Sequence, residues 1–258
     1  MPVPFYENPG FYAVIVSIAA IILSQMPPIY LLFRARRLDA EVHSRLGVTH
    51  MFGNLNLTLM VLARNAGGRE LLVRKMGLSL FRDGKLLGEY PSQQYFETPA
   101  STSPFLLVPF SIKPDERWIH PVVFFNTFDR NTEKVFRRHI TTLQDDIRNK
   151  LAARKPENEK EMAVAEPTLV APFIDHFEKT FALEPGEYVA SLSIAVEPGS
   201  ASYVKNYRFT LFESDIADLR KFVEGYKYGG GIHFNMQEHA PIWVQLTEDR
   251  QSSTPKTT

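Results

Sequence analysis

Residues Phe11 to Phe33 form a run without one charged side chain, and no other stretch constrains this chain as strongly. Ile, Val, Leu, Ala and Phe predominate in it, and Arg34, Arg36 and Arg37 follow at once. As a helix that rises ~1.5 Å per residue, the run would be about 34 Å long, enough to cross a hydrocarbon core of ~30 Å. We therefore expect residues 11–33 to be a transmembrane helix that contacts the lipid bilayer, preceded by a short tail over residues 1–10.

Charge on either side of this run predicts its orientation. Glu7 is the only charged side chain among the first ten residues, whereas the arginines follow the run. The positive-inside rule then predicts a single-pass inner-membrane protein with its N-terminus outside and its C-terminal domain cytoplasmic. A periplasmic domain is the alternative. A cleaved signal peptide and a buried core helix fit less well, because the run lacks a basic leader, an Ala-x-Ala site and a polar face. Pro27 and Pro28 predict a kink.

Residues 34–51 are interpreted as a juxtamembrane neck. Leu38, Val42 and Leu46 recur every four residues among charged neighbours, which is the spacing of an amphipathic helix.

From Phe52 onward the apolar period changes from that of a helix to two. Leu55, Leu57 and Leu59 alternate with polar residues, as in a strand with one buried face. Asp83-Gly84 predicts a tight hairpin turn, and residues 91–104 are rich in Ser, Thr and Pro and predict a loop. The expected strands cover residues 55–63, 71–81, 86–90, 105–112, 119–128, 189–196 and 203–212, with an irregular one at 232–246 anchored by Trp243.

Helical periodicity returns in two places. Asp129 or Asn131 can cap an amphipathic helix that includes Phe136 to Leu151, and a charged linker at 153–166 completes a helical insertion over residues 129–166. A C-terminal helix is expected over Asp215 to Tyr226, capped by Ser214 and ended by the glycines at 229–231. The pattern at 173–181 leaves helix and strand open.

About seven short strands with Gly and Pro turns favour a mainly β fold with α-helices, a β-sandwich over residues 52–246. Leu183 to Leu192 resembles the tyrosine corner of immunoglobulin-like sandwiches, in which a Tyr bonds back to upstream backbone; Tyr188 matches that Tyr, and Ala190 stands in place of Cys. The resemblance implies an immunoglobulin-like sandwich. Two domains split near Lys155 are the alternative, and residues 247–258 are interpreted as a disordered tail.

Composition narrows the chemistry. Lys plus Arg equals Asp plus Glu at 29 each, which argues against a nucleic-acid partner. The chain has no cysteine, so thiolate catalysis and Cys-ligated zinc are excluded.

Three groups of residues invite a chemical interpretation. His233, Glu238 and His239 resemble a metal-ligand set, but their spacing matches no zinc motif. Gly229 to Gly231 lacks the Gly-Lys-Ser/Thr ending of a phosphate loop, and Asp145-Asp146 lies on the polar face of a predicted helix. We predict no catalytic, cofactor-binding or metal-binding residue, no cofactor and no small-molecule ligand.

The expected function is therefore a non-enzymatic, protein-interaction or scaffolding role at the membrane, with a protein partner of unknown identity. The predicted contact surfaces are the outer face of the Phe136 to Leu151 helix and the aromatic, glycine-rich stretch from Tyr226 to Phe234. The alternatives are a membrane-tethered hydrolase or metal-dependent enzyme, and a periplasmic envelope-binding module.

Overall fold

Strands with alternating burial make up most of the protein. The computed structural model describes residues 9–25, 34–155, 161–232 and 240–249. Along β2 (Asn54–Asn65), every second residue is buried and its neighbours are partly exposed. β8 (Gly186–Glu197) repeats this pattern. The period of two places one apolar face of each strand against a common interior, as the sequence predicts.

The elements in chain order are α1 (Pro9–Gln25), β1 (Leu38–Met51), β2 (Asn54–Asn65), β3 (Leu71–Arg82), β4 (Lys85–Tyr95), β5 (Phe105–Leu106), β6 (Phe110–Ile112), β7 (Arg117–Phe125), α3 (Arg130–Ala152), α4 (Pro167–Thr180), β8 (Gly186–Glu197), η3 (Gly199–Ala201), β9 (Tyr203–Leu211), α5 (Glu213–Gly225), η4 (Tyr226–Tyr228), β10 (Ile242–Gln245) and β11 (Thr247–Glu248).

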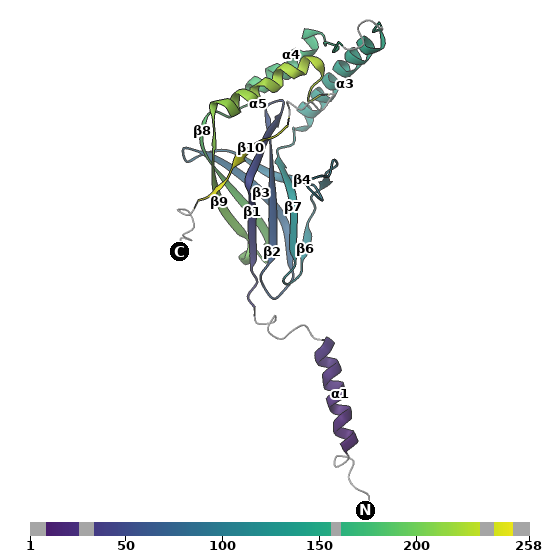
Figure 1. Ribbon diagram of the computed structural model, residues 1–258, viewed down its shortest axis with the longest axis vertical. Coiled ribbons are helices and arrows are strands. Elements are labelled where there is room, and N and C mark those ends of the chain that lie inside the picture. Colours follow the sequence, from purple (N-terminus) through teal and green to yellow (C-terminus); the bar gives the residue numbers. More distant parts are fainter. Residues whose placement is uncertain (1–8, 26–33, 156–160, 233–239, 250–258) are drawn as a thin grey trace, which may run out of the picture.

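The strands belong to one sheet and not to two packed sheets. Their order is β10-β1-β2-β7-β4-β3-β8-β9-β11, with β5 paired to β4 and β6 paired to β3. Twist accumulates across so many strands, and the sheet rolls into a near-closed barrel (Figure 1). The prediction of a mainly β fold with α-helices is confirmed, but the immunoglobulin-like β-sandwich is wrong.

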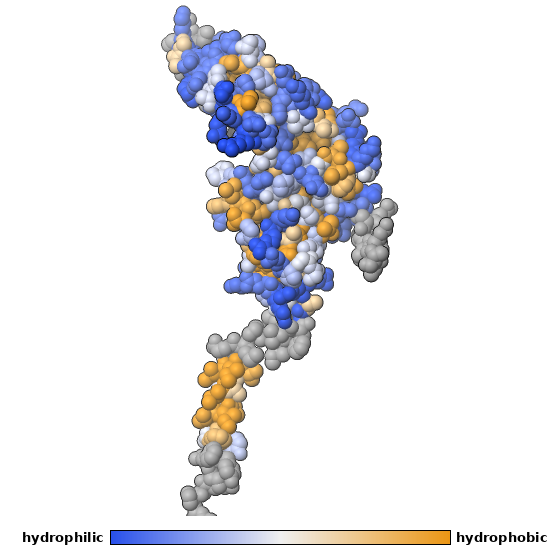
Figure 2. All heavy atoms as spheres, turned by 180° about the vertical axis from the view of Figure 1, so that it is seen from behind, coloured by the Kyte–Doolittle hydropathy of each residue, from blue (hydrophilic) through white to orange (hydrophobic). Residues whose placement is uncertain are grey.

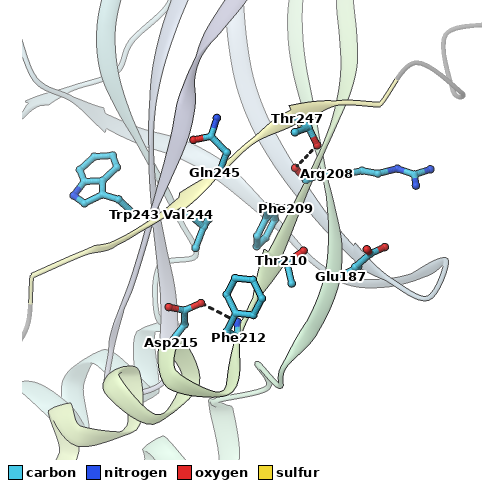
Figure 3. A pocket seen from close by; sticks show the side chains of 10 residues that line it. All are labelled: Glu187, Arg208, Phe209, Thr210, Phe212, Asp215, Trp243, Val244, Gln245 and Thr247. Carbon is cyan, nitrogen blue, oxygen red and sulfur yellow. Dashed lines mark hydrogen bonds between the residues drawn. The ribbon is translucent and has the colours of Figure 1, made fainter.

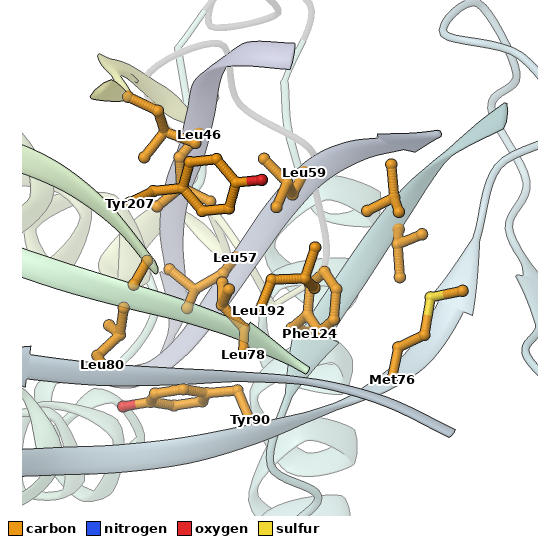
Figure 4. Packing of buried hydrophobic residues seen from close by; sticks show 14 of the residues in the cluster. Leu46, Leu57, Leu59, Met76, Leu78, Leu80, Tyr90, Phe124, Leu192 and Tyr207 are labelled. Atoms are coloured by element: carbon orange, nitrogen blue, oxygen red, sulfur yellow. The ribbon is translucent and has the colours of Figure 1, made fainter. Parts of the chain in front are cut away.

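The interior of the rolled sheet is filled by aliphatic side chains from nearly every strand. Figure 4 shows Leu57, Leu78 and Leu192 pointing toward one another from β2, β3 and β8. Each is almost completely shielded from solvent. Because burial of a leucine side chain contributes ~1.5–3 kcal/mol, this interior is the main source of stability for the sheet.

Three helices, α3, α4 and α5, gather at one end of the rolled sheet (Figure 1). The two-residue turn between β1 and β2 enters this layer. Phe52 and Gly53 both have positive φ angles, of 53° and 92°. The Phe52 ring lies 4.8 Å from that of Phe173 and stacks at 5.4 Å on that of Phe136. This turn therefore joins the sheet to a second apolar cluster within the helical layer.

His50, three residues before Gly53, also links the sheet to the helical layer. Its Nδ1 accepts a hydrogen bond from the Gly53 N–H at 3.1 Å, so Nε2 carries the proton and donates to the Leu219 carbonyl at 2.9 Å. The neutral ring lies among Phe177, Phe181 and Phe222.

The predicted neck helix at residues 34–51 is wrong. Leu38, Val42 and Leu46 lie on β1, which pairs with β2 along its length. A spacing of four satisfies both a helix and a strand, because four is a multiple of two and close to one turn. A register shift between Val42 and Leu46 keeps both halves of the strand aligned with β2.

The predicted transmembrane helix over residues 11–33 is also overturned. Within the described ranges, no helix has both the length and the hydropathy required to cross a membrane. α1 has 17 residues, about 26 Å at ~1.5 Å per residue, which is short of a ~30 Å hydrocarbon core. The predicted kink at Pro27 and Pro28 lies outside the described residues. The single-pass, inner-membrane assignment and its orientation depended on this span and are corrected with it.

α1 nonetheless exposes apolar side chains along its length, and Figure 2 shows it as a hydrophobic column. In Figure 1 it stands at the end of the rolled sheet opposite the helical layer.

Several local predictions are confirmed. The Asp129 carboxylate caps α3 by accepting from the N–H groups of Asn131 and Thr132. Asp83 and Gly84 form the positive-φ turn between β3 and β4. The Tyr188 hydroxyl donates to the Glu184 carbonyl at 2.6 Å and accepts from the Glu184 N–H at 3.0 Å, the contact of a tyrosine corner.

Other local predictions need correction. β4 continues to Tyr95, into the stretch expected to be a loop. The undecided segment at 173–181 belongs mostly to helix α4. At the start of α5, Asp215 and not Ser214 provides the side-chain cap, accepting from the Phe212 N–H at 2.8 Å.

Candidate functional site

One short C-terminal segment brings the two ends of the sheet together. β10 pairs with β1 at one end, with Gln245 opposite Arg45. Two residues later β11 pairs with β9 at the other end, with Thr247 opposite Arg208. The segment therefore crosses from β1 to β9 (Figure 1). On the far side of this crossing β9 and β10 are not paired with each other, which leaves a gap in the hydrogen bonding of the sheet. We call this gap the seam.

Backbone groups of both strands are directed into the seam. The Leu246 N–H donates to the Ser44 carbonyl at 2.7 Å, so alternate residues of β10 face β1. In an antiparallel ladder the intervening residues face the opposite way, which directs the N–H and C=O groups of Trp243 and Gln245 toward β9.

The same argument applies to β9. The Asp249 N–H donates to the Asn206 carbonyl at 3.0 Å, so the even-numbered residues of β9 face β11. Pairing with β11 ends at Arg208. The peptide groups of Thr210, the next residue that faces this way, therefore point into the seam. Two strand edges face each other there without a strand between them.

A cavity of about 470 Å³ occupies the seam. Figure 3 shows the side chains around it. Phe209 and Val244 are buried and form its floor, whereas Phe212 and Trp243 stand at the rim with 64% and 52% of their surfaces exposed. Large exposed aromatic side chains beside a cavity are typical of binding surfaces.

The two rim aromatics are held by different contacts. Phe212 is the N-cap residue of α5, and its backbone N–H donates a hydrogen bond to the Asp215 carboxylate. Trp243 lies opposite Gly47 of β1, and a Cβ at Gly47 would come within 3.3 Å of the indole. The indole can occupy this position because Gly47 has no side chain.

Some charged side chains around the seam form ion pairs and others do not. Arg208 pairs with Asp249 at 3.2 Å, and Asp249 has only 9% of its side chain exposed. Glu187 lies opposite Thr210 in the β8–β9 register and is exposed. Within the described part of the chain, Glu187 makes no side-chain hydrogen bond or ion pair.

The structure does not bring the sequence candidates into this site. His233, Glu238 and His239 lie outside the described residues. Among the residues that are described, no three His, Asp or Glu side chains lie close enough together to hold a metal ion.

The other candidate groups have local structural roles. Asp145 pairs with Arg148 at 2.9 Å, and Asp146 pairs with Lys150 at 3.0 Å, both along α3. Gly229 has φ 80° and accommodates the left-handed end of η4.

The predicted contact surfaces lie elsewhere. The outward face of α3 is charged and carries the Arg137–Glu133 ion pair at 2.7 Å. In the stretch from Tyr226 to Phe234, Tyr226 is buried in the helical layer and residues 233–234 are outside the described ranges. The sequence indicated Trp243 as an anchor but carried no signal for the seam, because pairing of β10 with β1 is a long-range event.

Comparisons with known proteins add little to this geometry. No protein-family model matches the chain, and no curated protein matches it. A crystal structure of a protein from Archaeoglobus fulgidus is similar over 69% of this chain and 98% of its own, at 8% identity and a TM-score of 0.27.

Proposed function

We propose that this protein is a non-enzymatic binding module that captures an extended segment of a partner polypeptide in the seam between β9 and β10. The observation that carries the proposal is the pair of facing strand edges, Thr210 on β9 and Trp243 with Gln245 on β10, across a cavity of about 470 Å³.

Strand edges provide the affinity in this mode of recognition. An added strand hydrogen-bonds to an exposed edge through its main chain, and pockets for alternate side chains give selectivity. The Thr210 edge offers one N–H and one C=O to such a strand. The edge of β10 offers those of Trp243 and Gln245 from the other side.

The side chains around the cavity suit the same ligand. A residue of the added strand that points inward would meet the apolar floor of Phe209 and Val244. A residue that points outward would lie between Phe212 and Trp243. Aromatic anchors of this kind often dominate binding energy.

Proline substitution tests the proposal. Thr210→Pro removes the N–H that faces the seam, and no ladder bond within the sheet is lost because pairing with β11 ends at Arg208. Gln245→Pro removes a facing donor from β10 and is a second, independent variant. Peptides of about nine residues, ~30 Å when extended, are selected from a displayed random library against the unmodified protein.

Binding is then measured through Trp243. The chain has two tryptophans, so Trp118→Phe leaves Trp243 as the sole indole reporter. Selected peptides should shift its emission to shorter wavelength as the exposed ring is covered. Both proline variants should lose binding, whereas Val204→Ala, an exposed change elsewhere on β9, should retain it. Selected peptides that bind all variants alike, or leave Trp243 emission unchanged, would overturn the proposal.

A further inference from the structure

We infer that the captured segment is basic, with an apolar residue between Phe212 and Trp243 and a Lys or Arg beside Glu187. This inference rests on the proposed function and names the chemical class of its ligand.

The seam belongs to a longer depression on the outer face of β8 and β9. A second cavity, of about 420 Å³, shares Glu187 and Arg208 with it and continues to the Asp83-Gly84 turn. A third, of about 700 Å³, shares Thr210 and Phe212 and continues to Glu213. A bound segment that leaves the seam on either side therefore meets these surfaces.

Carboxylates predominate along this depression. Its lining includes Asp83, Glu187, Glu213 and Asp215. The guanidinium of Arg208 is the basic group among the lining residues of these three cavities, and Asp249 already neutralises it at 3.2 Å.

One cation beside the depression, Arg82, is also engaged. Arg82 lies beside Gly186 and binds Glu184 at 2.5 Å, with Asp83 at 3.8 Å. Among the lining residues of the three cavities the uncompensated charge is therefore negative. Complementary charge on a partner favours encounter and register.

Glu187 lies where it can contact one side chain of the added strand. It lies opposite Thr210 in the β8–β9 register. At a strand spacing of ~4.8 Å, a strand added beside Thr210 would run about 10 Å from Glu187. The extended side chains of Lys and Glu together cover that separation, and both lie on the outer face.

The test compares three peptides of equal length on the Trp118→Phe background. Each alternates Val and Thr around a central Phe, and they differ only in carrying two Lys, two Gln or two Glu at the flanking positions. At low salt the lysine peptide should bind about twofold to fivefold tighter than the glutamine peptide, as expected for an exposed charge pair. The glutamate peptide should bind most weakly.

Glu187→Gln should remove most of the preference for the lysine peptide over the glutamine peptide. Glu70→Gln, the same charge change at an exposed site on the β2–β3 turn, should keep the preference. If the three peptides bound with equal affinity and all lost binding to Thr210→Pro, the inference that the ligand is basic would be overturned, but the proposed function would not. No shift with any of the three peptides, together with failure of the library selection, would overturn the proposed function itself.

Discussion

The indole of Trp243 lies across Gly47, so close that a Cβ at Gly47 would meet the ring at 3.3 Å. The two residues face each other in the β1–β10 register, between hydrogen-bonded pairs, where side chains approach most closely. Trp243, on β10, thus covers part of β1. The position of its ring at the rim of the seam depends on Gly47 having no side chain.

Gly47→Val should therefore displace the indole and weaken peptide binding roughly tenfold, as for loss of an anchor contact. Emission from Trp243 on the Trp118→Phe background reports the displacement directly. Gly199→Ala is the matched control, since nothing lies within 4 Å of a Cβ there. An unchanged emission spectrum in Gly47→Val would contradict this account of the rim.

Phe52→Ala should destabilise the protein by ~3–5 kcal/mol, because the ring fills the contact between the sheet and the helical layer. It touches Phe136, Phe173 and Tyr226. Denaturant unfolding followed by circular dichroism measures the loss. Leu87→Ala, at an exposed site on β4, should change the free energy of unfolding by less than ~0.5 kcal/mol. A similar effect of both substitutions would show that the junction contributes little.

Asn65→Ala should cost at least ~2 kcal/mol because it leaves buried backbone groups without partners. The completely buried side chain donates to the carbonyls of Arg69 and Ile112 at 2.8 Å each, and its Oδ1 accepts from Gly67 at 2.9 Å. Asn65→Asp keeps the shape and the acceptor but loses both donors, so it should also be destabilised. If the Asn65→Asp variant proved as stable as the parent in urea unfolding at neutral pH, this role would be ruled out.

The stability of the helical layer should fall as the pH drops below about 6.5. Burial lowers the pKa of His176 from its ordinary value of 6.5, and the charge of Lys179 lowers it further. The ring packs 4.6 Å from Phe136. On lowering the pH, His176 takes up its proton earlier in the unfolded chain than in the folded one. The stability contributed by its neutral ring is therefore complete above pH 6.5 and is lost as the pH falls through the lowered pKa.

His176→Gln cannot titrate and should flatten the corresponding part of the stability profile, measured by thermal unfolding between pH 5 and pH 8. His43→Gln, at an exposed position on β1, should leave the profile unchanged. Equal pH dependence in parent and His176→Gln would assign the loss of stability to other groups.

Local chemistry accounts for the features that could be read from the chain alone. Alternating apolar residues specify β2, β3, β8 and β9, because a strand repeats every two residues. Asp83-Gly84 and Asp129 specify a turn and a cap through contacts within a few residues. Tyr188 returns to Glu184, four positions away.

Features that depend on distant partners were not accessible in this way. The spacing of Leu38, Val42 and Leu46 suits a helix as well as a strand, and only the ladder with β2 selects the strand. The rolled sheet, in place of two packed sheets, follows from which edges meet. Crossing of the last strands from Arg45 to Arg208 creates the seam. The alternating side-chain pattern determines which face of a strand is buried, but not which distant strand pairs with it, so tertiary structure alone determined where the candidate site lies.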